Sequence, residues 1–401
     1  MSRPDSENLH LCPPFRAEHV GSLLRPIELL EKREQFRNNQ CSAQEVKAAE
    51  DAAIVSVVKL QQDVGMKTIT DGEYRRQYFF EGMFEKLEGM TFVSNRDLSE
   101  FKSYVPYVQL YHKMGMKEAP SIFCTGKIKR TVGIHTEDFK YLRSLVPADQ
   151  VGNIKITICS PIWLFLRHGS KQTYDLSVYK DDDEYFADLL NAYREEINKL
   201  YSLGCRHIQI DDPSFSFFCD ENMVIGMKEA GEDGDELLDI CIKRYNQLLQ
   251  GRPHDLTVSV HTCRGNFRGM HYSEGGYDRI ATKLFTNLEV DCFYLEYDNE
   301  RAGTLDPLRS LPRGKVVVLG LVTTKTGQLE SVGEVKSRVD QAVTIISEGA
   351  PKRPRAEALA QICISPQCGF ASVAEGNSIS EEEQREKLSL VVKAAEEIWP
   401  C

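Results

Sequence analysis

Short apolar segments alternate with longer helical segments along nearly the whole chain. The apolar segments are rich in β-branched or aromatic residues and are mostly continuous, which is typical of parallel strands buried on both faces. Helical patterns separate most of them, as in 43–64 and in 182–203, where Gly204 suits the end of a helix. Eight alternations favour one α/β domain with the (β/α)8 TIM-barrel fold over an open doubly wound sheet. The predicted strands are 18–23, 66–73, 121–128, 153–160, 207–212, 256–263, 291–298 and 315–322.

The chain length of 401 residues fits this prediction. A single domain is commonly about 150 residues long, but single β/α barrels reach about 250 residues or more. A hydrophobic share of 41% is enough for a sizeable core. We therefore expect a single barrel domain over 1–401, in which 1–14 is a flexible N-terminal tail.

Charge and composition exclude some partners and compartments. The formal net charge of −11 argues against nucleic acid and anionic membrane surfaces, because both attract basic faces. No apolar run approaches the ~18 residues of a membrane helix, and the N-terminus lacks the apolar core of a signal peptide. The sequence predicts a cytoplasmic protein, in which the 12 cysteines are buried or ligate metal and do not form disulfides. Homo-oligomer formation stays open.

Polar residues stand at the C-terminal end of nearly every predicted strand. In a β/α barrel these ends form one rim, so residues far apart in sequence meet in one pocket. Each of them alone could equally be a helix cap or a turn residue. Taken together, they place the predicted active site at the C-terminal ends of the strands. The set comprises Gly21, Ser22, Asp71, Glu73, Ser160, Asp211, Asp212, His261, Cys263, Glu296 and Asp298.

One imidazole, two thiols and a carboxylate are the most informative part of this set. His261 and Cys263 end one predicted strand, Glu296 lies in the next, and Cys368 stands near the C-terminus. Residues i and i+2 of a strand point the same way, so His261 and Cys263 are able to reach one ion. This donor mixture suits Zn²⁺, and zinc bound to it remains electron-rich enough to hold a substrate thiolate. The alternative for the His–Cys pair alone is a buried histidine beside a structural cysteine.

Seven motifs in one order resemble the catalytic half of cobalamin-independent methionine synthase, and more closely its stand-alone single-barrel relatives. They are FRAEHVGSLLRP, DGEYRR, IQIDDPSF, SVHTCRGN, LEYD, VVLGLVTTKTGQLES and ISPQCGF, and the resemblance spans about 15–375. It implies zinc held by His261, Cys263, Glu296 and Cys368. It also implies a homocysteine site, in which carboxylates bind the ammonium group and strand-end amides the carboxylate. The substrate residues that it implies are Val20, Gly21, Ser22, Glu73 and Asp211, with His19 beside them.

The chain departs from the family pattern where the methyl donor would bind. The family has a histidine in the last strand's loop that helps to protonate the leaving group, whereas LVTTKTGQLES has none and offers Lys325 or Thr323. Trp163 of CSPIWLFL is displaced from the family's usual tryptophan position. The amino-terminal barrel of the full-length synthase is also missing. Asp211 and Lys325 are therefore the predicted catalytic residues, and the identity of the donor stays open.

These observations predict a zinc-dependent thiol alkyltransferase whose partners are a small-molecule thiol and a methyl or alkyl donor. Methyl transfer to homocysteine or a close analogue is the leading hypothesis. One alternative keeps the site and uses another thiol, such as coenzyme M, with C–S bond formation or cleavage. A second is a zinc- or thiol-binding protein without turnover, whose metal is fully closed by protein ligands. A metal-free decarboxylase on the same barrel is a weaker third alternative, because it leaves the cysteines without a role.

Overall fold

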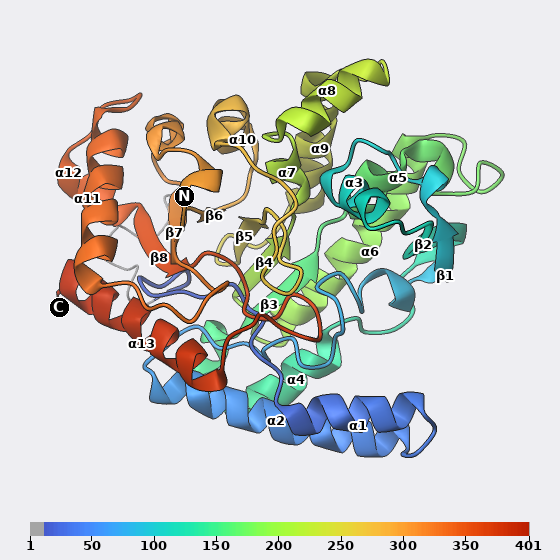
Figure 1. Ribbon diagram of the computed structural model, residues 1–401, viewed down its shortest axis with the longest axis horizontal. Helices are drawn as coiled ribbons and strands as arrows, with labels where there is room; N and C mark the ends of the chain where they lie inside the picture. Colours follow the sequence, from blue (N-terminus) through green and yellow to red (C-terminus); the bar gives the residue numbers. More distant parts are fainter. Residues whose placement is uncertain (1–11, 401) are drawn as a thin grey trace.

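A parallel sheet of six strands forms the centre of the computed structural model, which describes residues 12–400 (Figure 1). The strand order β3-β4-β5-β6-β7-β8 follows the chain, so each strand pairs with the next one. Apart from Thr257, every residue of these strands is buried, which explains the continuous apolar segments of the sequence. Five predicted strands are confirmed. The strands are β3 Lys155–Cys159, β4 His207–Asp211, β5 Thr257–Thr262, β6 Cys292–Glu296, β7 Val316–Val322 and β8 Ile362–Pro366.

The first two predicted strands contact the two edges of this sheet without forming regular strands. Ala17 makes a parallel bridge with Ile364 of β8, and Ile69 makes one with Ile154 next to β3. The two segments also contact each other, since the amide of Leu23 donates to the carbonyl of Gly72 at 3.1 Å. Both edges of the sheet are thus connected through 17–23 and 66–72, and the ends of these segments lie beside the C-terminal ends of the strands.

The predicted barrel strand over 121–128 is wrong. These residues belong to β2 (Glu118–Lys129), which pairs antiparallel with β1 (Glu88–Asp97) in a separate two-stranded sheet. A short β-branched run has the same appearance in a hairpin as in a barrel, so composition alone does not distinguish the two. The strand that the prediction missed is β8, which pairs with β7 at the end of the six-stranded sheet and runs into the start of the ISPQCGF motif.

Helices cover the sheet, and both helices predicted from the sequence are confirmed. The α2 helix begins at a capping box, in which the Ser42 hydroxyl accepts from the amide of Glu45 while the Glu45 carboxylate accepts from the amide of Ser42. The α6 helix ends just before Gly204, whose φ of +110° few other residues adopt. The helices are α1 Ile27–Arg37, α2 Ala43–Asp63, α3 Pro106–Lys113, α4 Thr136–Leu145, α5 Trp163–His168, α6 Asp182–Ser202, α7 Ser214–Phe217, α8 Glu221–Glu229, α9 Gly234–Leu249, α10 Ala281–Asn287, α11 Val332–Glu348, α12 Arg355–Ala360 and α13 Glu381–Ile398.

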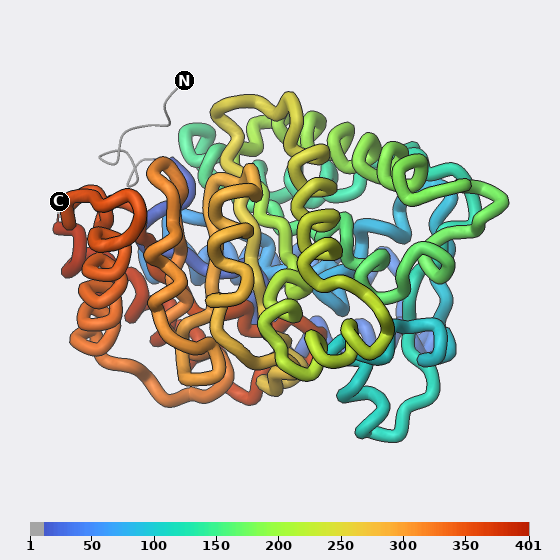
Figure 2. The backbone as a smooth tube through the Cα atoms, turned by 90° about the horizontal axis from the view of Figure 1, so that it is seen from above, coloured from blue at the N-terminus to red at the C-terminus, as the bar shows by residue number. Residues whose placement is uncertain are grey.

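The outer elements are arranged in chain order. The α1 and α2 helices lie side by side along one edge, and the β1–β2 hairpin lies at the end of the molecule opposite α11 and α13 (Figure 1). Seen from above, the chain from α6 to α13 advances across the molecule from green to red (Figure 2). Of the predicted tail over 1–14, residues 1–11 lie outside the described residues, and Pro14 is buried.

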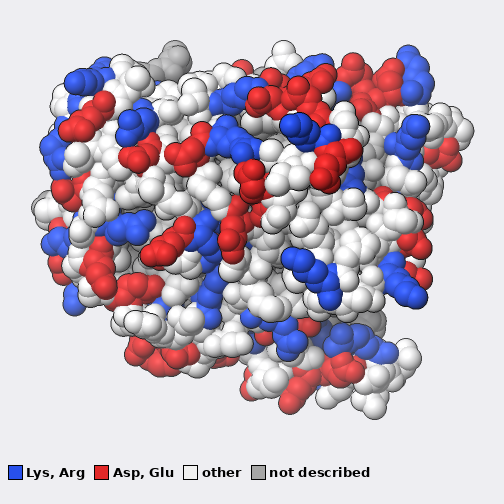
Figure 3. All heavy atoms as spheres, turned by 45° about the horizontal axis from the view of Figure 1, so that its top comes forward, with Lys and Arg blue, Asp and Glu red and all other residues white. Residues whose placement is uncertain are grey.

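Two surface properties bear on partners. No helix within residues 12–400 is long and apolar enough to cross a membrane. On the face shown in Figure 3, basic and acidic side chains are interspersed, and that face carries no continuous basic area.

Candidate metal centre and substrate cavity

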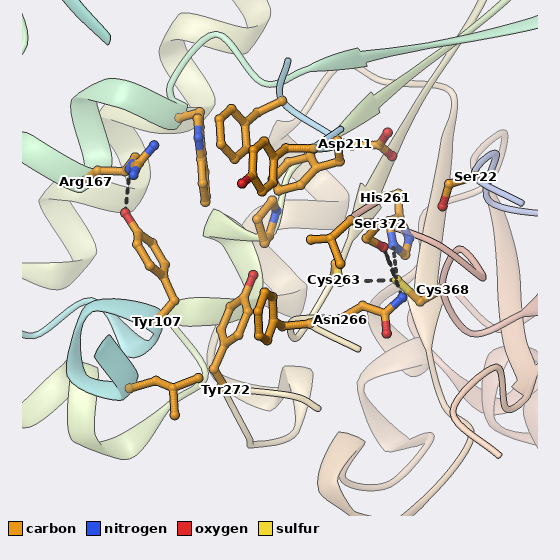
Figure 4. A pocket seen from close by; sticks show the side chains of 18 of the residues that line it. Ser22, Tyr107, Arg167, Asp211, His261, Cys263, Asn266, Tyr272, Cys368 and Ser372 are labelled. Atoms are coloured by element: carbon orange, nitrogen blue, oxygen red, sulfur yellow. Dashed lines mark hydrogen bonds between the residues drawn. The ribbon is translucent and has the colours of Figure 1, made fainter. Parts of the chain in front are cut away.

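Four side chains with metal-ligand chemistry meet at the C-terminal edge of the sheet. His261 belongs to β5 and Cys263 follows it, Glu296 ends β6, and Cys368 lies two residues beyond β8. One ligand atom from each residue lies within 4.8 Å of the others. The two sulfur atoms are 3.3 Å apart, and Cys368 Sγ is 3.6 Å from His261 Nε2 (Figure 4). The structure therefore brings the predicted ligands together in a group that could hold a metal ion.

The geometry of this group fits a tetrahedral zinc ion. With Zn–S bonds of about 2.3 Å and Zn–N bonds of about 2.05 Å, a tetrahedron places sulfur and nitrogen roughly 3.6 Å apart and two sulfurs roughly 3.8 Å apart. The sulfur–nitrogen distance already agrees, and the two sulfurs would separate by a few tenths of an ångström. His261, Glu296 and Cys368 are buried, whereas His261, Cys263 and Cys368 also line the cavity, so a cation here would be largely surrounded by protein yet reachable from the cavity.

The surroundings favour anionic forms of two of the ligands. A hydrogen bond from the Cys263 thiol lowers the pKa of Cys368 to about 5, against the effect of burial, and His261 acts in the same direction. Burial opposes ionisation of Glu296, yet Lys325 and Arg301 bring its pKa below the usual value. Negative charge held in a buried site at neutral pH is what a bound cation requires.

Two carboxylates lie beside this group. The side chains of Glu73 and Asp211 both line the same cavity as the cysteines. Thr157 Oγ1 donates to Glu73 Oε1 at 2.9 Å, and Gln209 Nε2 donates to Asp211 Oδ1 at 2.7 Å. Burial, reinforced by the charge of Glu73, raises the pKa of Asp211 to about 7. An ammonium group between these carboxylates would relieve their repulsion.

The backbone around Glu73 is held in an unusual conformation. Its φ of +62° lies in the left-handed region, which is uncommon for a residue other than glycine. Asp71 Oδ1 accepts from the amide of Glu73 at 2.9 Å and stabilises this turn. Backbone in sparsely populated conformations is found most often at functional sites, and the Glu73 side chain lines the cavity.

The first predicted strand contributes to the same cavity unequally. Val20 and Ser22 line it. Gly21 does not, but it packs so closely that an added Cβ would lie 2.6 Å from Thr157 Cγ2 and 3.4 Å from Glu73 Oε1. His19 turns away: its Nε2 lies 3.2 Å from the carbonyl of Thr68, and burial together with Lys155 lowers its pKa to about 3. A substrate contact by His19 stays a prediction.

Lys325 contacts the loop that follows Cys263 and does not line the cavity. Its ammonium contacts the carbonyl of Gly265 at 3.2 Å and Asn266 Oδ1 at 3.3 Å. Asn266 lines the cavity whereas Lys325 does not. The neighbouring Asp212, in contrast, follows the turn-capping alternative, because its Oδ1 accepts from the amide of Ser214 at 2.8 Å.

The cavity continues from the cysteines into a second, apolar compartment. The whole cavity, including the end lined by the cysteines, has a volume of about 270 Å³. Much of this compartment was not predicted from the sequence, because α3 and the loop before β2 contribute to it and neither lies at the end of a sheet strand. Arg167, after an apolar run in α5, was missed as well, although a charge that ends such a run was a usable signal. The lining of this compartment includes Phe79, Phe80, Tyr107, Leu110, Tyr111, Met114, Met116, Trp163, Arg167, Phe267 and Tyr272.

Comparison with known proteins identifies the family. Residues 15–118 and 166–397 match the profile described as "Cobalamin-independent synthase, Catalytic domain". YxjH of Bacillus subtilis, an uncharacterised protein, is 36% identical over 96% of this chain and 95% of its own length. A crystal structure of a putative vitamin-B12 independent methionine synthase from Listeria monocytogenes is 31% identical, with a TM-score of 0.72 over 97% of this chain and 99% of that one.

Some of the more distant relatives are much longer than this chain. The 5-methyltetrahydropteroyltriglutamate–homocysteine methyltransferase of Lactiplantibacillus plantarum is 22% identical over 93% of this chain, which spans only 42% of that enzyme. The profile leaves out 119–165, which contains most of the hairpin strand β2. The extent of the profile match, together with the YxjH relative, shows that the chain belongs to the cobalamin-independent methionine synthase family and corresponds to its catalytic domain.

Proposed function

We propose that this protein is a zinc-dependent methyltransferase that methylates the thiol of homocysteine or a close analogue, on a (β/α)8 barrel. The observation that supports this most is that one cavity is lined by His261, Cys263 and Cys368 of the four-residue ligand group and also by the carboxylates Glu73 and Asp211. The ligand group suits a thiolate site, and the carboxylates suit the ammonium of an amino-acid thiol.

Each residue has a defined part in substrate binding. Glu73 and Asp211 accept hydrogen bonds from the substrate ammonium group, and Ser22 with the backbone at Val20 and Gly21 binds its carboxylate. This orientation directs the thiol toward His261, Cys263, Glu296 and Cys368. Zinc bound by these four residues supplies stabilisation of a substrate thiolate at neutral pH. Binding also holds the substrate sulfur in a fixed position relative to the methyl carbon, and this alignment increases the rate of transfer.

The substrate thiol releases its proton to solvent; the sulfur then forms a bond to the methyl carbon as the bond from that carbon to the donor breaks, and the electron pair of the broken bond stays on the donor's leaving atom. The donor occupies the apolar compartment beside the cysteines. Its leaving atom takes up a proton, and Lys325 is the proposed source, positioned by its contacts with Gly265 and Asn266. Lys325 does not line the cavity in this structure, so this step requires donor binding to bring its ammonium group into the cavity.

The charge of the thiol end favours homocysteine over a sulfonate thiol such as coenzyme M. The carboxylates Glu73 and Asp211 line this end of the cavity; an ammonium group beside them favours their ionised forms, whereas a sulfonate opposes ionisation. Arg76 contacts Glu73 at 3.6 Å and is thereby paired already. An amino-acid thiol therefore fits the site better.

X-ray absorption at the zinc edge tests this proposal. Zinc-loaded protein is measured alone, with homocysteine and with coenzyme M. We expect an additional Zn–S contact with homocysteine only, followed by methionine formation, read by mass, with at least one of a panel of methyl donors. An additional contact only with coenzyme M would support the alternative thiol. No new contact with either thiol would indicate a closed storage site and contradict the proposal.

A further inference from the structure

Two neighbouring strand residues hold the paired carboxylates of the cavity. Thr157 of β3 and Gln209 of β4 are paired in register, and both are buried. Thr157 Oγ1 donates to Glu73 Oε1 at 2.9 Å, and Gln209 Nε2 donates to Asp211 Oδ1 at 2.7 Å. Each of these two carboxylates is therefore held by one member of the pair.

Gln209 also contacts the first predicted strand. Its Nε2 donates to the carbonyl of Val20 as well as to Asp211, so one amide group connects two separate segments of the cavity wall. Asp211 follows two residues later and points to the same side of β4. Val20 precedes Gly21 and Ser22, which belong to the proposed site for the substrate carboxylate. The amide of Gln209 thus fixes the separation between the proposed carboxylate and ammonium sites.

The presence of a glutamine at this position is not explained by stability alone. Gln209 is fully buried, and both N–H groups of its amide are used, one for Val20 and one for Asp211. Its Oε1, however, has no hydrogen-bond partner among residues 12–400. An unpaired buried acceptor is unfavourable. The glutamine is therefore better explained by the two groups that its Nε2 holds in place.

The Glu73 side of the site is fixed in a different way, by close packing. An added Cβ on Gly21 would lie 2.6 Å from Thr157 Cγ2 and 3.4 Å from Glu73 Oε1. Arg76 Nη2 also donates to Thr157 Oγ1. Asp211, in contrast, is connected to the segment that contains Gly21 through the amide of Gln209.

We propose that Gln209 is a positioning residue that makes the thiol site selective for one enantiomer of an α-amino acid. Enantiomers differ in how the ammonium group, the carboxylate and the side chain are arranged around one carbon. With the carboxylate at 20–22 and the ammonium at Asp211, only one enantiomer directs its sulfur toward the metal ligands. A fixed separation of these two positions therefore disfavours the other enantiomer. This inference rests on the proposed function, because it uses the amino-acid site assigned there.

The affinities of the two enantiomers of homocysteine test this inference. Their dissociation constants for zinc-loaded protein are measured by isothermal titration calorimetry, and the ratio of the D to the L constant is compared between variants. We expect the wild type to bind L-homocysteine, the enantiomer of metabolism, about tenfold or more tightly than D-homocysteine. Gln209→Met keeps the length of the side chain and removes both N–H donors, so the ratio should fall to about threefold or less. A purely structural role would weaken both enantiomers equally and leave the ratio unchanged.

Two further variants complete the experiment. Gln209→Asn keeps an amide, but its side chain is shorter by one methylene and cannot reach both acceptors, so the ratio should also fall to about threefold or less. Gln361→Met is the matched control. Gln361 donates to the carbonyls of Pro312 and Lys315 and lies just before β8, at the N-terminal edge of the sheet. This variant should lower the thermal midpoint and leave the ratio unchanged.

Three results would overturn the inference. The first is a wild type without a preference for L-homocysteine, and the second is an unchanged ratio in folded Gln209→Met. If Gln209→Met does not fold, Gln209→Asn decides the question in the same way. The third is failure of both variants to fold, which would assign Gln209 to stability.

The proposed function fails separately. L- and D-methionine, whose sulfur has no proton to lose, allow the same comparison without thiolate formation. A protein that loses its preference for L-methionine in Gln209→Met but gains no Zn–S contact with homocysteine would refute the thiolate site and leave the role of Gln209 intact. A Zn–S contact with homocysteine together with an unchanged ratio would refute only the role of Gln209.

Discussion

The sulfur atoms of Cys263 and Cys368 lie 3.3 Å apart although 105 positions separate the two residues in the sequence. Cys263 follows β5 and Cys368 follows β8, and β6 and β7 lie between these strands in the sheet. The loops after β5 and β8, which two intervening strands separate in the sheet, therefore meet at its C-terminal edge. Both thiols are free cysteines, and with His261 and Glu296 they form the only group of at least three potential ligands found within residues 12–400.

Replacing Cys368 by serine tests this group directly. A serine hydroxyl is a poor zinc ligand compared with a thiolate, so Cys368→Ser should lower the zinc content to well below one ion per chain. Metal content is measured by plasma emission spectrometry on folded protein. Cys41→Ser, in the loop between α1 and α2, is the matched control and should retain full metal. Full retention in Cys368→Ser would remove Cys368 from the ligand set.

Replacing Asp211 by asparagine tests the ammonium site. The change keeps the shape of the side chain and removes its charge, and the loss of one charged hydrogen bond costs roughly 1.5–3 kcal/mol. We expect KM for homocysteine to rise by about tenfold or more. An unchanged KM would indicate a thiol without an amino group.

Asp212→Asn provides the neighbouring control for this experiment. Asp212 Oδ2 accepts from Ser160 Oγ at 2.7 Å and also from the hydroxyl of Tyr245, so the carboxylate belongs to a buried structural network. This variant should lower the thermal midpoint and leave KM for homocysteine unchanged. The two adjacent aspartates would then separate substrate binding from stability.

Three members of the ligand set, His261, Cys263 and Glu296, belong to predicted strands, whereas Cys368 follows β8, which was not predicted, and was grouped with them by its donor type and by the family resemblance. His261 and Cys263 end a continuous apolar run, and residues two apart on a strand share a face. Glu296 ends the next run, and parallel strands bring such ends to one edge of the sheet. Period and order placed these residues at one edge of the sheet, whereas the complete zinc set and the substrate roles of Glu73 and Asp211 came from the resemblance to the family.

The donor side of the cavity was not predictable in the same way. Tyr107 and Met114 reach the cavity from α3 and its C-terminal end, within a segment between two hairpin strands. The apolar run at 121–128 has the composition of a barrel strand, but it pairs with β1, which is largely exposed. The hydrophobic periodicity of a strand does not show which distant segment it pairs with. The charge of Arg167 after the apolar run in α5 was a usable signal, but the rings of Trp163 and Tyr107 beside it are brought there by the fold.

Replacing Gly21 by alanine tests how Glu73 is positioned. Gly21 has φ of +139°, and a Cβ there would lie 2.6 Å from Thr157 Cγ2 and 3.4 Å from Glu73 Oε1. We expect Gly21→Ala to lower the free energy of unfolding by about 1–3 kcal/mol, because the backbone is strained. KM for homocysteine should rise as well, because Glu73 is displaced.

A second substitution separates the steric contact from the backbone strain. Thr157→Ser removes Cγ2 and retains the hydroxyl that donates to Glu73, so Gly21→Ala with Thr157→Ser should recover part of the lost affinity for homocysteine. Gly115→Ala is the control for strain alone, since Gly115 has φ of +74° and nothing lies within 4 Å of an added Cβ. An equal rise of KM in Gly115→Ala would show that the effect is unrelated to Glu73.

His168 gives the pH dependence of stability a defined source. Its Nε2 lies 2.7 Å from Ser121 Oγ and its Nδ1 lies 2.8 Å from the carbonyl of Glu100, which suits a neutral ring. Burial, with Arg167 and Arg96 nearby, lowers the pKa of His168 to about 2. An unfolded histidine titrates near ~6.5. Below that pH the unfolded chain therefore binds a proton that the folded chain does not.

The sign of the effect follows from this difference in proton uptake. As pH falls from about 6.5 toward 4, His168 should reduce the free energy of unfolding by about 1.4 kcal/mol per pH unit, and this loss is absent above pH ~6.5. His168→Gln keeps one donor and one acceptor but does not titrate, so its stability should fall less steeply with acid in urea titrations. The exposed His254→Gln should follow the wild type. Parallel curves for His168→Gln and the wild type would show that protonation of His168 does not oppose folding.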